Sequence, residues 1–258
     1  MNKSRLNLLS FNIQVGIESR HYRHYFTRFW QHLLPAKQRQ INLTDISQII
    51  KDYDIVALQE VDGGSLRSSY INQVKFLSEA SNLNSWSHQC NRNLGKLAQH
   101  SNGLLSRLKI IKVSHHKLPG RIPGRGAIEA LLGNPEYPLA IFVVHLSLGK
   151  RARNQQLGYL TKMIQQHPYC ILMGDWNTSP DKLEPWAVNN QLTIAGLDKS
   201  LKTYPSWQPK VHIDHILVSN NLSIESAQIL DVHISDHLPI AVSIKLPSFI
   251  TSGIHHDQ

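Results

Sequence analysis

Cysteine is scarce in this chain of 258 residues, which contains only Cys90 and Cys170. Two cysteines exclude the disulfide framework of a small secreted scaffold, and Cys170 lies in an apolar run where a reduced, packed thiol is expected. Long hydrophobic runs are also missing, so no helical membrane span is expected. Residues 1–10 include basic side chains but no small-residue cleavage pattern, and we therefore expect a soluble, cytoplasmic protein.

Acidic residues are outnumbered by lysine and arginine, 18 against 27, which gives a formal charge of +9. Such a balance favours polyanionic partners, either nucleic acid or an anionic lipid surface. Because linker-like and low-complexity tracts are missing from the sequence, we expect one domain over 1–258, with a core over about 5–247 and a flexible tail over 248–258. Nothing in the composition indicates a protein partner, and we expect a monomer.

The segment 18–35, called here the aromatic segment, has the most unusual composition of the chain. Aromatic residues recur in it at spacings of three and four, which predicts a helix. The favoured interpretation is that its aromatic face packs onto the core. The alternative is a basic, aromatic arm that stacks on bases or lies at a membrane interface. The interleaved basic and aromatic positions include Arg20, Tyr22, Arg23, Tyr25, Phe26, Arg28, Phe29 and Trp30.

Two apolar runs in the first quarter of the chain end in a polar residue. The run 6–12 ends in Asn12, and the run 54–60 ends in Glu60 shortly before a glycine pair. Helical periodicity follows each run, over 38–53 and over 70–80. The alternation of strand and helix predicts an α/β fold, with Asn12 and Glu60 at strand ends.

A third apolar run, 169–175, ends abruptly in Asp175. Because successive side chains on a strand point to opposite faces, Asp175 and Asn177 are predicted to share a face at roughly 6.6 Å of axial separation. Gly174 leaves room for a second backbone or a ligand, and Pro180 ends the strand. Taken alone, these residues suit a plain turn as well as a site for a metal-bound phosphate.

Further polar residues follow the same pattern. His145 lies near the end of the apolar run 139–149, although a lone histidine there is more often structural. The run 211–218 alternates polar and apolar residues around Asp214, which predicts a half-buried strand. Asp236 and His237 lie in a polar turn before the last strand, and adjacent side chains point apart, so they are predicted to do different jobs.

Buried strands thus repeatedly present oxygen and imidazole ligands, and this series resembles the endonuclease/exonuclease/phosphatase superfamily of metal-dependent phosphohydrolases. The motifs run in the order of that superfamily over about 9–246. The resemblance implies an α/β fold, a four-layer α/β/β/α sandwich of two packed, mostly antiparallel mixed sheets, with the site between the sheets at the strand ends. The matching motifs are Ser-Phe-Asn12, Leu-Gln-Glu60, Asn102-Gly-Leu-Leu-Ser-Arg107, Val-His145-Leu, Gly-Asp175-Trp-Asn177, Ile-Asp214-His-Ile and Ser-Asp236-His237.

The resemblance also implies a cofactor and a catalytic pair. Glu60, helped by Asn12 and Asp236, would hold Mg²⁺ or Mn²⁺, hard cations that prefer oxygen ligands. His237, oriented by Asp214, would activate the attacking water.

The resemblance also implies roles for further site residues. Asp175 is an alternative base in some accounts of the family, and the sequence leaves the choice open. Asn177 would position the nucleophile or a phosphate oxygen, and His145 would donate to a non-bridging oxygen or help the leaving group. Weaker candidates for contact with substrate phosphate are Arg125, Arg121 and Asn102.

Core motifs of this kind imply the reaction type and leave the substrate open. The basic balance favours a nuclease acting on DNA or RNA, since phosphate contacts dominate affinity for nucleic acid. The alternative is a sphingomyelinase-like lipid phosphodiesterase or phosphoinositide phosphatase at a membrane surface. A third possibility, a binding protein that has lost catalysis, is disfavoured because the implied metal and base positions are all occupied by suitable residues.

Overall fold

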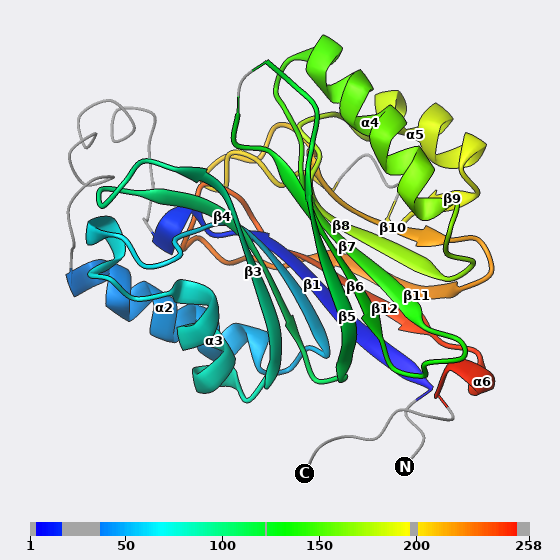
Figure 1. The fold of residues 1–258 in the computed structure, drawn as a ribbon, viewed down its shortest axis with the longest axis horizontal. Helices are drawn as coiled ribbons and strands as arrows, with labels where there is room; N and C mark the ends of the chain where they lie inside the picture. Colours follow the sequence, from blue (N-terminus) through cyan, green and yellow to red (C-terminus); the bar gives the residue numbers. More distant parts are fainter. Residues whose placement is uncertain (1–3, 17–36, 122, 197–200, 252–258) are drawn as a thin grey trace.

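The computed structural model describes residues 4–16, 37–121, 123–196 and 201–251, which form two six-stranded sheets packed face to face (Figure 1). The first sheet has the order β11-β12-β1-β2-β4-β3. In it β1 and β2 run parallel, and the other neighbours are antiparallel. Its strands are β1 (Arg5–Asn12), β2 (Ile55–Val61), β3 (Ser85–Asn93), β4 (Gln99–Ser106), β11 (Ser223–Ile229) and β12 (Ile240–Lys245).

The second sheet has the order β5-β6-β7-β8-β10-β9. Here β7 and β8 form the parallel pair, again at the centre, and the remaining neighbours are antiparallel. Its strands are β5 (Ile110–Lys117), β6 (Gly126–Leu132), β7 (Leu139–His145), β8 (Cys170–Asp175), β9 (Leu192–Ile194) and β10 (Asp214–Ser219). This arrangement confirms the predicted α/β sandwich of two mixed sheets.

Helices cover the outer face of each sheet (Figure 1). Helices α2 (Lys37–Ile50) and α3 (Gln73–Ser81) pack on the first sheet, and α4 (Lys150–Ile164) and α5 (Pro180–Asn189) pack on the second. The N-terminus of α3 is capped by the side chain of Asn72, and α5 begins with Pro180, a residue suited to the first helical position. The order helix, sheet, sheet, helix gives four layers.

Side chains of the central strands are buried on both faces, which explains why their sequences are largely apolar. In β1, Leu6 and Leu8 face the second sheet, whereas Leu9 and Phe11 face the helices. Strand β8 shows the same division, because its side chains also enter the inter-sheet core and the core under α4 and α5 in turn. Both faces are buried, so most positions before the strand end are apolar. Each fully buried leucine contributes about 1.5–3 kcal/mol to stability.

Three predictions about elements need correction or stay open. Strand β10 is buried along its whole length rather than half-buried, because β8 and β9 flank it and both sheet faces are covered. The region after 247 begins with the short helix α6 (Ser248–Thr251), and Ile250 is fully buried, so the flexible tail predicted from 248 is wrong over these residues. The aromatic segment lies entirely outside the described residues, and the prediction for it remains untested.

Helices of the described part of the chain all fall short of the length and apolar character that crossing a bilayer requires.

Candidate active site

Strands of both sheets end at one edge of the sandwich, and four of the predicted site residues lie at these ends. Asn12 ends β1, and Glu60 lies one residue before the end of the neighbouring β2. In the second sheet His145 ends β7 and Asp175 ends β8, and the two residues are register partners. Asp214, the first residue of the antiparallel β10, is also paired with Asp175. The two parallel pairs therefore meet across the inter-sheet core.

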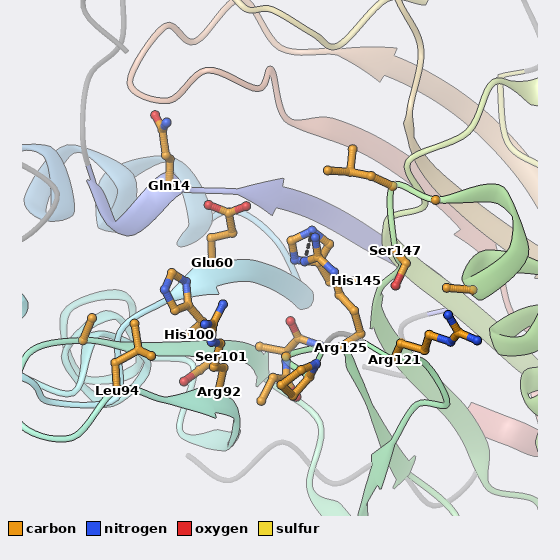
Figure 2. A pocket seen from close by; sticks show the side chains of 18 of the residues that line it. Gln14, Glu60, Arg92, Leu94, His100, Ser101, Arg121, Arg125, His145 and Ser147 are labelled. Carbon is orange, nitrogen blue, oxygen red and sulfur yellow. Dashed lines mark hydrogen bonds between the residues drawn. The ribbon is translucent and has the colours of Figure 1, made fainter. Parts of the chain in front are cut away.

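Glu60 occupies a β-bulge. The pairing of β2 with β4 shifts register between Gln59 and Val61, and Glu60 has a φ of 55°. Residues with a side chain rarely adopt this left-handed conformation, which is maintained at functional sites by the surrounding structure. The bulge turns Glu60 out of the ladder, and its side chain lines a pocket together with Asn102 and His145. Figure 2 shows Glu60 and His145 in the wall of this pocket.

Asp62 anchors the loop that follows Glu60, a role that the sequence interpretation missed. The Asp62 carboxylate is fully buried and forms an ion pair with Arg67, Nε to Oδ2 at 2.9 Å. Burial alone raises its pKa, but hydrogen bonds from Ser65 and Gly64, with the charge of Arg67, lower it to about 2. Six donors reach its two oxygens: the backbone N–H of Gly64, Ser65 and Gln99, the hydroxyls of Ser65 and Ser68, and Nε of Arg67.

Gly174 allows β8 to approach β7 closely just before Asp175. Its φ is 152°, and a Cβ built on it collides with the backbone oxygen of Val144. The prediction that this glycine leaves room for a second backbone is confirmed. Asp175 is 2% exposed, and its Oδ2 accepts a hydrogen bond of 3.3 Å from Nδ2 of Asn12 in the other sheet. Burial and the nearby Asp214 raise the pKa of Asp175.

Asn177 does not continue the strand, so the predicted shared face of Asp175 and Asn177 is wrong. Strand β8 ends at Asp175, and Asn177 has a φ of 51°. The cause is local: the backbone N–H of Asn177 donates to Oδ1 of Asp175 at 2.9 Å, which turns the chain. The amide of Asn177 donates to the backbone oxygen of Leu146, 2.9 Å away, and so supports the loop after β7.

His145 is buried between a cation and a carboxylate. Its Nε2 lies 2.6 Å from Nη1 of Arg125 and 3.3 Å from Oδ2 of Asp175. Since a guanidinium only donates, His145 accepts through Nε2 and is neutral in this arrangement. Burial, and then the charge of Arg125, lower the pKa of His145 well below its usual range. Burial also lowers the pKa of Arg125, while the carboxylates of Asp175 and Glu60 oppose that change.

Asp214 and His237 form a second buried pair. Nδ1 of His237 lies 2.8 Å from Oδ2 of Asp214, and the ring of Tyr204 packs on the imidazole with centroids 4.9 Å apart. Burial lowers the pKa of His237, but Asp214 outweighs that effect and holds the pKa well above the usual range. Oδ1 of Asp214 is buried and has no hydrogen-bond partner among the described residues.

Asp236 is brought to the site by contacts of its neighbour. The Ser235 hydroxyl donates to the backbone oxygen of Asn12 at 2.7 Å, which fixes the 235–237 turn over the end of β1. Burial raises the pKa of Asp236 to about 6, with Glu60 and Asp214 acting in the same direction and His237 opposing them. Crowded carboxylates of this kind are stabilised by a cation.

The donor atoms fit a divalent metal ion. One ligand atom each from Asp175, Asp214 and His237 lies within 4.8 Å of the other two. Oδ1 of Asp214, buried and without a hydrogen-bond partner among the described residues, is a carboxylate oxygen available for such an ion. The structure thus brings together acidic and imidazole donors that could hold a metal, although this group differs from the predicted set of Glu60, Asn12 and Asp236.

A pocket of about 880 Å³ opens beside these residues (Figure 2). Asn102 and Arg125 lie in its wall, and Nδ2 of Asn102 donates to the backbone oxygen of Gly126 at 3.0 Å. Arg121 lies on the side of the pocket away from Glu60 in Figure 2. Several lining residues were not predicted from the sequence, among them His100, Arg92 and Arg151. Of these three only His100 had a signal, since it lies two positions before Asn102 on β4.

Solved structures with the same architecture come from distant relatives. An endonuclease/exonuclease/phosphatase from Beutenbergia cavernae DSM 12333 has 15% identity and a TM-score of 0.72, with 95% of this chain and 72% of that chain covered. A mannosyl-6-phosphatase from Bacteroides thetaiotaomicron VPI-5482 has 18% identity and a TM-score of 0.67, with 93% and 99% covered. D. rerio TDP2 complexed with a single-strand DNA product has 15% identity and a TM-score of 0.66, with 94% and 100% covered.

At these identities the similarity establishes the fold alone. A search of curated proteins found no match. The sequence profile of the Endonuclease/Exonuclease/phosphatase family, whose members hydrolyse phosphoesters, matches residues 9–237. That match spans the chain from β1 to His237 and includes the strand-end residues described above. With most of its length matched, the chain belongs to the endonuclease/exonuclease/phosphatase family.

Proposed function

We propose that this protein is a Mg²⁺- or Mn²⁺-dependent phosphodiesterase that cleaves DNA or RNA. The single observation that carries the proposal is the buried Asp214–His237 pair beside acidic donors and an arginine-lined pocket. The formal charge of +9 supports a polyanionic substrate. The structural neighbours include a protein complexed with a single-strand DNA product and a sugar phosphatase, so both diester and monoester chemistry occur on this fold.

Glu60, Asn12 and Asp236 are the residues we propose as metal ligands, because they offer the oxygen donors that hard cations prefer. The bound ion would neutralise charge that develops on the phosphate. The bulge at Glu60 supports this assignment, since it turns one carboxylate toward the pocket from a strand whose side chains are otherwise buried.

His237 is the base that we propose. Its Nδ1 donates to Asp214, so in the neutral imidazole Nε2 is the basic nitrogen that takes a proton from water. The Asp214 carboxylate fixes this tautomer and stabilises the imidazolium that forms. Asp175 is already held at both oxygens by Asn12 and Asn177, an arrangement that suits positioning and charge better than proton transfer.

The reacting phosphate would lie between His145 and the basic wall of the pocket. Arg125 contacts His145 in the structure, and its guanidinium fork matches two oxygens of a phosphate. Asn102 has a buried Oδ1 with no partner among the described residues, so it can accept from a substrate hydroxyl or from water. Asn177 acts indirectly in this scheme, because it supports the loop that follows His145.

A panel of substrates tests the proposal. The purified chain, stripped with EDTA and then supplied with Mg²⁺ or Mn²⁺, is incubated with supercoiled plasmid, RNA, bis(p-nitrophenyl) phosphate and mannose 6-phosphate. Metal-dependent cleavage of a nucleic acid is expected, with loss of activity in His237→Ala. The matched control is His233→Ala in the same turn, whose side chain is 46% exposed. Inertness toward every phosphoester with both metals would contradict the proposal.

A lipid phosphoesterase is the second candidate, and the pocket mouth supports it. Leu94 and Leu148 line the pocket and are 40% and 76% exposed, and Leu97, whose backbone N–H donates to the oxygen of Leu94, is 54% exposed. Apolar side chains next to arginines suit a membrane interface. Leu94→Gln with Leu148→Gln would then lower hydrolysis of sphingomyelin or phosphoinositide vesicles, while Val188→Gln on α5, 64% exposed, serves as control. Cleavage of lipid alone would replace the nuclease assignment.

A further inference from the structure

Positive charge dominates the pocket wall. Five arginines and a single carboxylate, that of Glu60, line the cavity. Arg67 is neutralised by Asp62, and Arg125 is hydrogen-bonded to His145. The remaining three make no ion pair with any carboxylate that the structure describes; they are Arg92, Arg121 and Arg151.

Unpaired like charges in a concave site repel one another, and a bound anion relieves that repulsion. A volume of about 880 Å³ is far larger than one phosphate group needs and lies within the range of small-molecule pockets. The reacting phosphate is accounted for beside His145 and Arg125, so the unpaired arginines lie where another part of the same substrate would be.

The segments that carry Arg121 and Arg151 are both held in place by hydrogen bonds of one buried side chain, that of Gln156. Gln156 on α4 is 1% exposed, and its Nε2 donates to the backbone oxygen of Pro119 at 3.0 Å and to Oγ of Ser147 at 2.9 Å. Its Oε1 accepts from the backbone N–H of Ser147 at 2.8 Å. The loop that carries Arg121 is thereby joined to the segment that leads from β7 into Arg151. A frame fixed before binding lowers the entropic cost of holding a ligand.

Of the segments that Gln156 joins, the one at Ser147 lies close to His145 in the sequence and lines the same pocket. Ser147 comes two residues after His145, and Figure 2 shows Ser147 and Arg121 on the side of the pocket away from Glu60. Nη1 of Arg153 donates to the backbone oxygens of Ser147 and Leu148, 3.1 and 2.8 Å away, which further fixes the segment. A group bound there would therefore belong to the molecule whose phosphate reacts at His145.

We propose that Arg121, Ser147 and Arg151 form a second-phosphate subsite, which binds a phosphate group adjacent to the one hydrolysed. This inference rests on the proposed function and narrows it, because the preferred substrate must carry at least two phosphates. Guanidinium groups make paired, charge-assisted hydrogen bonds to phosphate, and the hydroxyl of Ser147 offers one more donor. An oligonucleotide meets this requirement, and so does a bisphosphorylated sugar.

The test compares substrates that differ by one phosphate. kcat/KM is measured for the dinucleotide TpT against pTpT and TpTp, and for fructose 6-phosphate against fructose 1,6-bisphosphate. The wild-type chain is expected to prefer a doubly phosphorylated member by about tenfold or more. Arg121→Gln with Arg151→Gln should abolish the preference, mainly through KM, whereas Lys162→Gln at the other end of α4 should retain it. The dinucleotide and sugar pairs distinguish the two sources of phosphate.

A binding measurement separates this inference from the proposed function. Calorimetric titration with inorganic tripolyphosphate in EDTA should give binding to the wild type and to Lys162→Gln, and at least about tenfold weaker binding to the double variant. If no phosphoester is hydrolysed but tripolyphosphate binding depends on the two arginines, the subsite stands and the proposed function fails. Equal tripolyphosphate binding by wild type and double variant, or an unchanged substrate preference, overturns the subsite.

Discussion

Nδ1 of His237 and Oδ2 of Asp214 are 2.8 Å apart, and both side chains are buried, although Asp214 begins β10 of the second sheet and His237 lies just before β12 of the first. Asp214→Asn would place an amide in the same space and remove the charge that fixes the tautomer. We expect kcat to fall by about 10²-fold or more in Asp214→Asn and in His237→Ala, with little change in KM. Steady-state kinetics on bis(p-nitrophenyl) phosphate checks this, and a loss below tenfold in both variants sinks the assignment of the base.

Metal affinity provides a prediction that does not depend on turnover. Glu60→Gln should weaken Mn²⁺ binding by about tenfold or more, since a carboxylate ligand of a hard cation is lost. Isothermal titration of the wild type and the variant measures the effect, with Glu79→Gln on the exposed face of α3 as the control. Unaltered binding in Glu60→Gln would instead direct attention to the grouping of Asp175, Asp214 and His237.

The strand ends could be predicted from the sequence because burial on both faces leaves a distinctive pattern. Strand β8 is apolar on both faces up to Gly174, so Asp175 stands out as its first charged residue, and Asn12 follows the largely apolar run of β1 at its end. The family motifs added the order of the remaining residues. The fold and the positions of the strand-end residues could therefore be predicted from the sequence.

Features that depend on residues far apart in the sequence could not be predicted from it. The left-handed conformation of Glu60 follows from the register of β2 with β4, and the turn at Asn177 follows from a hydrogen bond to Asp175. The Asp62 network needs Gln99, which lies 37 residues away. The arginines of the pocket wall come from elements far apart in the sequence, such as β3 for Arg92 and α4 for Arg151, so no local sequence pattern predicts that they line one pocket.

Replacing Gly174 with any residue that has a side chain should destabilise the fold. Gly174→Ala combines a φ of 152° with a collision against the backbone of Val144, so we expect a loss of about 2–4 kcal/mol in unfolding free energy. Gly158→Ala provides the matched control, because that glycine lies within α4 with open space around it and should gain about 0.5–1 kcal/mol. Urea denaturation monitored by circular dichroism compares the two, and equal midpoints for the two variants would contradict the prediction.

Asp62 should make the free energy of unfolding depend on pH in the acid range. Its pKa is depressed to about 2 in the folded chain, below the value of about 3.9 in an unfolded chain. The stabilisation is therefore fully present above about pH 4 and is lost as pH falls toward 2, by on the order of 2 kcal/mol. Asp62→Asn should lower stability at neutral pH and flatten the dependence between pH 4 and 2, which urea titrations at several pH values would detect. A variant with the same acid profile as the wild type would rule out this role.

Strand β12 determines when the site can be completed. It pairs with β1, Arg5 opposite Lys245, and it follows directly after Asp236 and His237. During synthesis the second sheet's last strand, β10, is complete at Ser219, whereas Asp236, His237 and β12 are made after it. A product of translation that stops before Asp236 therefore lacks both the proposed base and the strand that holds it next to β1, and we expect it to be inert.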